Sequence, residues 1–105
     1  MSRALKEQRA QYSGSAELFV EGGKRFDVDV RLIRYVDVVE VKTLAGVEYR
    51  DGVRSWDGRV DGLTELDRLQ LRGSQMHLKL PDGGEGEVAF TENSTYIQGY
   101  GVAPF

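Results

Sequence analysis

The sequence predicts an all-β fold, a small antiparallel barrel or sandwich of six to eight short strands with at most one short helical turn. Apolar and polar residues alternate along residues 24–42, which is the two-residue period of a strand with one buried face. Turn-forming residues recur about every ten positions, the spacing of an all-β domain. A helical apolar period is never sustained long enough for a crossover helix.

The first eleven residues, MSRALKEQRAQ, favour helix by propensity but contain only Ala4, Leu5 and Ala10 as apolar residues to bury. We therefore expect residues 1–11 to form a flexible N-terminal tail and residues 12–105 to form a single β domain. A chain of 105 residues can bury one hydrophobic core without the help of a disulfide or a metal.

The first long alternation is predicted to belong to a hairpin. Gly22-Gly23 separates residues 16–21 from residues 24–33, as in a two-residue β-hairpin. From Phe26 to Leu32 the apolar residues hold even positions, whereas Val39 and Val41 hold odd positions. One face cannot stay buried through that switch, so we expect a bulge, bend or break near residues 33–38.

The middle of the chain contains several glycines after acidic residues. Ala45-Gly46 and Asp51-Gly52 are predicted turns. Asp57-Gly58 lies too close to its neighbouring turn signals to be a hairpin tip, which predicts a glycine bulge or a close backbone approach. Thr64 then precedes leucines spaced by three residues and suits the N-cap of a single helical turn that plugs a barrel end.

The last third of the sequence predicts a meander of three strands. Alternating apolar residues at 76–80 are followed by the turn Pro81-Asp82-Gly83-Gly84, by a returning strand at 85–90 and by a turn at Glu92-Asn93-Ser94. A final strand covers residues 95–101, and we expect Phe105 to pack against the core.

Five short motifs lie along the domain, namely Tyr12-x-Gly14-x-Ala16, Val28-x-Val30-x-Leu32, Trp56-x-Gly58-Arg59-Val60, Leu80-Pro81-x-Gly83 and Ile97-x-Gly99-x-Gly101-x-x-Pro104-Phe105. With them the chain resembles a bacterial domain of unknown function that is found alone or fused C-terminally to flavin-dependent monooxygenases. The resemblance spans residues 12–105, but residues 33–54 fit it poorly. It implies a compact β domain that accompanies a redox enzyme, and it implies no catalytic residues.

Composition excludes several classes of function. The chain has no cysteine and one histidine, which rules out thiolate zinc sites, iron–sulfur clusters, cysteine nucleophiles and multi-histidine metal sites. A formal charge of −3 with interspersed signs argues against nucleic-acid binding. No apolar run approaches the roughly 20 residues of a membrane-spanning helix. We therefore expect a cytoplasmic protein with no cofactor, no metal and no nucleic-acid or membrane partner.

The most interesting cluster surrounds Trp56. An aromatic residue beside a glycine and two arginines, Arg54 and Arg59, suits a pocket for a planar or anionic ligand. Tyr35 and Tyr96 would add amphipathic rings to the pocket or to a homodimer face. The simpler interpretation is a core tryptophan with surface arginines, and composition favours it.

We expect a non-catalytic accessory or interaction β domain that acts with an oxidoreductase and forms a homodimer. The alternative is a small-ligand-binding barrel, or an enzyme, with a pocket near Trp56. A third hypothesis, catalysis by His77, has less support, because His77 lies opposite the apolar face of its predicted strand and is expected to be exposed.

Overall fold

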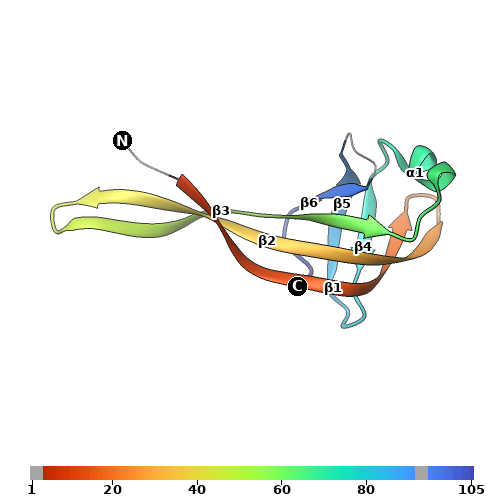
Figure 1. Ribbon diagram of the computed structural model, residues 1–105, viewed down its shortest axis with the longest axis horizontal. Helices are drawn as coiled ribbons and strands as arrows, with labels where there is room; N and C mark the ends of the chain where they lie inside the picture. Colours follow the sequence, from red (N-terminus) through yellow and green to blue (C-terminus); the bar gives the residue numbers. More distant parts are fainter. Residues whose placement is uncertain (1–3, 92–94) are drawn as a thin grey trace.

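The computed structural model describes residues 4–91 and 95–105 and is a closed barrel of antiparallel strands (Figure 1). The described chain forms six strands, in the barrel order β1-β2-β3-β6-β5-β4. These are β1 (Ala4–Val20), β2 (Arg25–Thr43), β3 (Gly46–Asp61), β4 (Met76–Lys79), β5 (Glu85–Phe90) and β6 (Tyr96–Tyr100). One helix, α1 (Glu65–Leu71), follows β3. The predicted all-β fold with one short helix is confirmed.

The barrel interior is filled by apolar side chains. Strand alternation directs one side of every strand inward, and Leu18, Leu32, Val60, Leu78 and Ile97 are fully buried there. No polar or charged residue of the described chain is buried. The predicted packing of Phe105 is confirmed, since its ring contacts this core. The interior is therefore a packed core rather than a ligand chamber.

Two predicted connections are confirmed. Phe19 of β1 pairs with Arg25 of β2 across Gly22-Gly23, which is the expected first hairpin. Strands β4, β5 and β6 form the expected meander, with the backbone N–H of Gly83 donating to the carbonyl of Leu80 in the turn. The turn predicted at Glu92-Asn93-Ser94 lies outside the described residues.

The predicted tail over residues 1–11 is wrong for residues 4–11. These residues are the first part of β1 and pair with residues 33–39 of β2. The backbone bonds offered by β2 outweigh the weak helix propensity of the segment. Residues 5–9 stay exposed, so no alternation of apolar and polar residues marks the strand in the sequence. Residues 1–3 lie outside the described chain.

The irregularity expected near residues 33–38 is confirmed. The inserted bulge residues lie on β1 and β3, the two strands that pair with this part of β2. The β1–β2 register shifts between Gln8 and Ala10, so that Arg9 is a bulge. The β2–β3 register shifts between Val36 and Val38, where Gly52 and Val53 of β3 lie opposite Asp37 alone. The turn predicted at Asp51-Gly52 is therefore a bulge inside β3, and three strands expected to be short are 17, 19 and 16 residues long.

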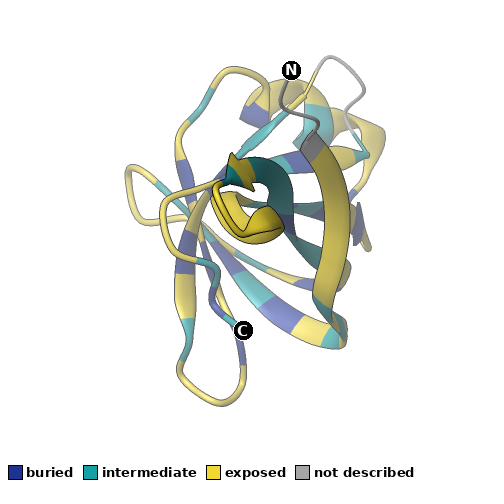
Figure 2. Cartoon of the chain, turned by 90° about the vertical axis from the view of Figure 1, so that its left-hand side faces the viewer, coloured by how far each residue is buried: buried dark blue, intermediate teal, exposed yellow. Residues whose placement is uncertain are grey.

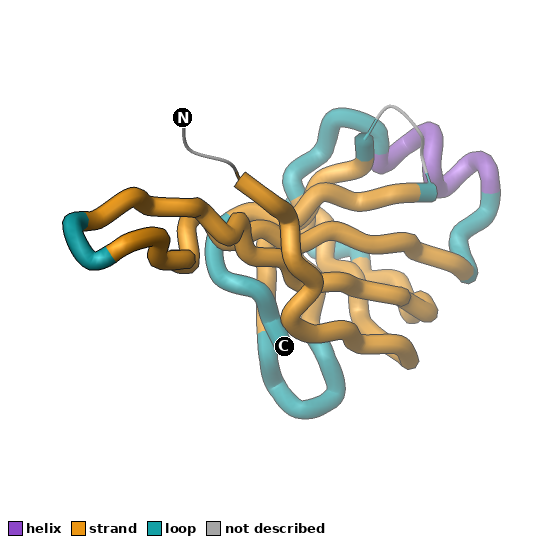
Figure 3. Tube along the Cα trace, turned by 60° about the vertical axis from the view of Figure 1, so that its left-hand side comes forward, coloured by secondary structure: helices purple, strands orange, loops and turns teal. Residues whose placement is uncertain are grey.

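Beyond the bulges, β2 and β3 continue as a hairpin that leaves the barrel. We call residues 37–53 the arm. It projects from one end of the molecule, whose extents are 56 × 29 × 20 Å (Figures 1 and 3). Figure 2 looks toward the arm and shows mostly exposed residues around its tip. Among the described residues, no core side chain comes from the arm.

Helix α1 lies at the opposite end of the molecule from the arm (Figure 1). The predicted cap is present, because the Thr64 hydroxyl accepts from the Asp67 N–H at 3.1 Å and the Asp67 carboxylate accepts from the Thr64 N–H at 3.3 Å. Leu63 and Leu71 pack against the barrel core. The predicted helical turn is therefore present, but Leu66 and Leu69, two of the three leucines at the predicted spacing, are exposed.

Candidate functional site

A pocket of about 500 Å³ opens where the arm leaves the barrel. It lies at the surface rather than inside the barrel, and its walls come from the bulged parts of β1, β2 and β3 and from the segment after β6. Its lining residues are Arg9, Arg34, Tyr35, Val36, Asp51, Arg54, Ser55, Trp56, Gly101, Val102 and Ala103. We call it the junction pocket. Its walls combine guanidinium groups, hydroxyls and apolar surface, the composition of a small-ligand site.

Trp56 contributes to the junction pocket from the core side. Its side chain is 1% exposed, which confirms the interpretation of Trp56 as a core residue. Gly86 and Gly99 face its ring, and a Cβ at Gly86 would lie 2.6 Å from the indole. Phe105 contacts the indole edge-to-face, with ring centroids 6.3 Å apart. Within the described chain the indole Nε1 has no hydrogen-bond partner.

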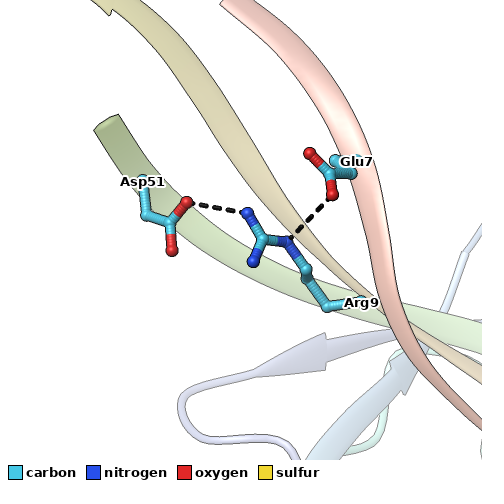
Figure 4. Close-up of polar contacts among 3 residues, drawn as sticks. All are labelled: Glu7, Arg9 and Asp51. Atoms are coloured by element: carbon cyan, nitrogen blue, oxygen red, sulfur yellow. Dashed lines mark hydrogen bonds and ion pairs between the residues drawn. The ribbon is translucent and has the colours of Figure 1, made fainter. Parts of the chain in front are cut away.

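Arg9 lies at the rim of the junction pocket and links two strands that are not neighbours. Its guanidinium donates to the Asp51 carboxylate on β3 at 2.8 Å and lies 3.4 Å from the Glu7 carboxylate on β1 (Figure 4). Since β2 lies between β1 and β3, this ion pair spans β2. Both ends are about half exposed, so the pair contributes roughly 0.2–1 kcal/mol.

The two remaining arginines of the junction pocket differ in their partners. The Arg34 guanidinium donates to the Phe105 carbonyl oxygen at 2.6 Å and also lies 5.8 Å from the Phe105 ring centroid. Arg54 is exposed, and its guanidinium has no hydrogen bond or ion pair within the described chain. An unpaired guanidinium is free to bind a carboxylate or phosphate in two-pronged geometry.

Tyr35 adds a phenol to the junction pocket. Burial raises the pKa of Tyr35 above its ordinary value of 10.0, and the nearby Asp57 carboxylate raises it further. The ammonium of Lys6 lies 4.7 Å from the ring centroid. The Tyr35 hydroxyl therefore stays protonated near neutral pH and remains a hydrogen-bond donor.

The structure brings three of the five predicted site residues together. Trp56, Arg54 and Tyr35 line the junction pocket, whereas Arg59 and Tyr96 pair with each other across β3 and β6. Arg59 lies on the opposite face of β3 from Trp56 and is exposed. Its guanidinium Nε lies 3.6 Å from a carboxylate oxygen of Asp61. The ligand pocket predicted from sequence therefore does not extend to Arg59 or Tyr96.

Sequence reasoning missed the other charged residues of the junction pocket, namely Arg9, Arg34 and Asp51. Arg9 lies in the segment expected to be a tail, and Asp51 lies in an expected turn. Their proximity depends on pairing across three strands, which carries no local signal in the sequence. For Arg9 and Asp51 the cause is that the sequence does not reveal the bulges in β1 and β3.

The arm is the second candidate site. Leu44, Val47, Tyr49 and Val53 are exposed on it, with Tyr49 at 69% and Val53 at 70% of full exposure. Strand β6 pairs with β3 only at residues 57–59, so in the described chain no strand pairs with the outer edge of β3 along residues 46–54. A free strand edge beside apolar side chains is a common protein-docking surface.

In the part of the chain that the structure describes, no group of three or more potential metal ligands occurs. His77 is exposed on β4, as expected, and is directly opposite Glu87 of β5. Within residues 4–91 and 95–105, no helix is long and apolar enough to cross a membrane.

Comparison with protein-family models, with curated proteins and with solved structures found no match to this chain. Inferences about function therefore depend on the geometry of the arm and the junction pocket, together with the motif resemblance.

Proposed function

We propose that this protein is a non-catalytic interaction domain that docks onto another protein through its arm. The observation that carries this proposal is the exposure of apolar residues on a hairpin that contributes nothing to the barrel core. A strand pair that is not needed for the core would normally be short and polar on both faces. Apolar side chains retained at such a place indicate contact with a second surface.

The filled barrel supports the same proposal. Trp56, Leu18 and Met76 occupy its interior and are almost fully buried, which leaves no chamber for a substrate. The motif resemblance suggests a flavin-dependent monooxygenase or a related oxidoreductase as the partner. The complete lack of cysteine suits a reducing compartment, and we propose the cytoplasm.

The test is binding to a flavin-dependent monooxygenase from the same genome, measured by calorimetry. The arm variant carries Val47→Ser together with Tyr49→Ser, and the matched control carries Leu66→Ser together with Leu69→Ser, exposed apolar residues on α1. Loss of about 2 kcal/mol, roughly thirtyfold in affinity, is expected for the arm variant alone. Equal affinity of the two variants would exclude the arm as the docking surface.

A second candidate function is favoured by one specific observation, the unpaired guanidinium of Arg54 in a pocket of about 500 Å³. We propose as the alternative that the junction pocket binds a small carboxylate or phosphate with an apolar or planar body. Trp56 is the only tryptophan and lines this pocket, so its fluorescence reports occupancy.

Benzoate and benzamide are matched probes for the second candidate, because they differ in charge but hardly in shape. Benzoate should change the Trp56 fluorescence in a saturable way, and Arg54→Gln should weaken its binding about tenfold. Arg59→Gln, which lies outside the pocket, is the control. Equal responses to benzoate and benzamide would contradict an anion site.

A further inference from the structure

The outer edge of β3 in the arm has a backbone that is ready to pair with another strand. Residues 46–51 pair regularly with β2 on one side, and the opposite side has no partner in the described chain. Six extended residues form an edge long enough for β-augmentation. We propose that two copies of this chain pair antiparallel along this edge, about a twofold axis at Tyr49. The inference deepens the proposed function, on which it depends, by naming a partner for the arm.

The hairpin turn determines which residues can donate across the edge. Thr43 and Gly46 flank the two-residue loop Leu44-Ala45, and residues in that position form a hydrogen-bonded pair with each other. Hydrogen-bonded pairs alternate with non-hydrogen-bonded pairs along the hairpin. Val47, Tyr49 and Asp51 therefore direct their N–H and C=O groups outward, away from β2. A second copy of β3 would pair with these groups through its own Val47, Tyr49 and Asp51.

Twofold axes at Glu48, Tyr49 and Arg50 each place outward groups opposite outward groups, and charge selects one of these axes. An axis at Glu48 places Glu48 opposite its own copy, and an axis at Arg50 places Arg50 opposite its own copy. Like charges directly opposite each other destabilise a strand pair. An axis at Tyr49 instead places Glu48 opposite Arg50 of the second copy, twice by symmetry.

The Tyr49 register uses contacts that already exist within one copy. Glu48 and Arg50 lie on the same face of the arm, with their charged atoms 3.1 Å apart. Pairing of two copies brings both ion pairs together as a group of four alternating charges. On the other face, Val47 and Tyr49 of one copy would meet Asp51 and Tyr49 of the other, which covers the exposed ring of Tyr49.

Self-complementarity is the reason to choose a second copy over an unrelated strand. A twofold interface requires that each residue and its opposite match in both directions, and Glu48 and Arg50 meet this condition about Tyr49. The resulting sheet is continuous through both copies, in the order β1-β2-β3 and then β3-β2-β1 of the second copy.

Charge reversal tests the register in the full chain. Glu48→Arg places Arg opposite Arg50, and Arg50→Glu places Glu opposite Glu48, so each single variant should weaken the dimer about tenfold in sedimentation equilibrium. The double variant Glu48→Arg/Arg50→Glu restores opposite charges and should dimerise within about threefold of wild type. A double variant as weak as the single variants overturns the proposed register.

Cysteine cross-linking gives an independent readout, because the chain has no cysteine of its own. Residues opposite each other in a hydrogen-bonded pair have Cα atoms about 5.5 Å apart, which a disulfide spans. Tyr49→Cys should form a disulfide-linked dimer under mild oxidation. Val47→Cys is the matched control, since its two copies would be separated by about 14 Å. Faster linking at position 47, or none at 49, overturns the inference.

The inference and the proposed function fail in different experiments. Sedimentation of the wild type as a monomer at every concentration, with no Tyr49→Cys cross-link, overturns self-pairing. If hydrogen exchange then shows the β3 edge protected by the oxidoreductase, the docking function stands with a different occupant. The converse outcome is a wild type that dimerises and a Val47→Ser/Tyr49→Ser variant that still binds the oxidoreductase normally. That outcome supports self-pairing and contradicts docking of the enzyme through the arm.

Discussion

Trp56 is a barrel core residue that also lines the junction pocket. Its indole is fully buried between β5, β6 and the C-terminal segment, and it fits there because Gly86 and Gly99 have no side chains. A Cβ at Gly99 would approach the indole Nε1 to 2.5 Å, closer than real side chains pack. Gly99 does not have a positive φ, so steric space alone explains the glycine.

Gly99→Ala is therefore expected to destabilise the fold by about 3 kcal/mol, through overpacking against Trp56. The control is Gly73→Ala, where φ is +78° and the described chain has no atom within 4 Å of the new Cβ. That substitution should cost only about 1 kcal/mol of backbone strain. Urea unfolding measures both values, and equal losses would show that the contact with Trp56 is unimportant.

Tyr35 supplies a prediction for pH dependence. Its pKa is raised mainly by burial and secondarily by Asp57, so the folded state binds the phenolic proton more tightly than the unfolded state. The associated stability is complete below the unfolded-state pKa near 10 and is lost as the pH rises through the folded-state pKa. Asp57→Asn should lower the Tyr35 pKa only partly, because burial remains.

The measurement is the phenolate absorbance titration, taken as the difference between wild type and Tyr35→Phe so that one tyrosine is isolated. The same difference, measured with and without Tyr35→Phe in the Asp57→Asn background, gives the part of the Tyr35 pKa shift that the Asp57 carboxylate causes. A Tyr35 pKa that returns to its ordinary value in Asp57→Asn would show that the carboxylate, rather than burial, is the main cause.

At the level of elements, β2 shows what the sequence can and cannot predict. The alternation of residues 26–32 correctly predicts a strand with a buried face, and the parity switch correctly predicts an irregularity near residues 33–38. The sequence cannot distinguish a bend within a barrel from a hairpin that leaves it, since exposed valines and buried valines alternate alike. The pairing of β1 with β2 past Gln8 has no local signal either.

The candidate site could be predicted only in part, because its residues come together through strand pairing and not through a local sequence pattern. Trp56 and Arg54 lie two residues apart on β3, and the pairing of β3 with β2 in the structure places Tyr35 beside them. Arg9 and Asp51 meet only because a bulge on each of two strands turns them toward each other across β2. A bulge depends on tertiary pairing, so local sequence patterns do not fix its position.

Helix α1 is short enough for its cap to matter. Thr64→Ala removes the hydroxyl that accepts from the Asp67 N–H, and it should destabilise the protein by about 1 kcal/mol. Thr64→Ser keeps the hydroxyl and should retain most of that stability. Thermal unfolding of the two variants gives the comparison, and identical midpoints would mean that the capping box makes no net contribution.

At the level of the whole molecule, the arm and the barrel should be separable. Replacing residues 40–49 by Asn-Gly keeps Val39 and Arg50 as the hydrogen-bonded pair around a two-residue loop. Because the arm provides no core side chain in the described structure, the free energy of unfolding should stay within about 1 kcal/mol of wild type. Trp56 fluorescence during urea unfolding is the readout.

The shortened protein should also lose both proposed associations, the pairing with a second copy and the docking onto an oxidoreductase. A shortened chain that unfolds without cooperativity would instead make the arm part of the folding unit. A shortened chain that still dimerises would move the interface to another surface of the barrel.

The close fit of Trp56 against Gly86 and Gly99 also limits how the sequence can evolve. A side chain at either glycine is tolerated only after residue 56 has become smaller, so the order of substitutions matters. Related chains that carry alanine or serine at position 99 should carry a smaller residue than tryptophan at position 56. The three positions are expected to change together, while the apolar residues of the arm change with the surface that the arm contacts.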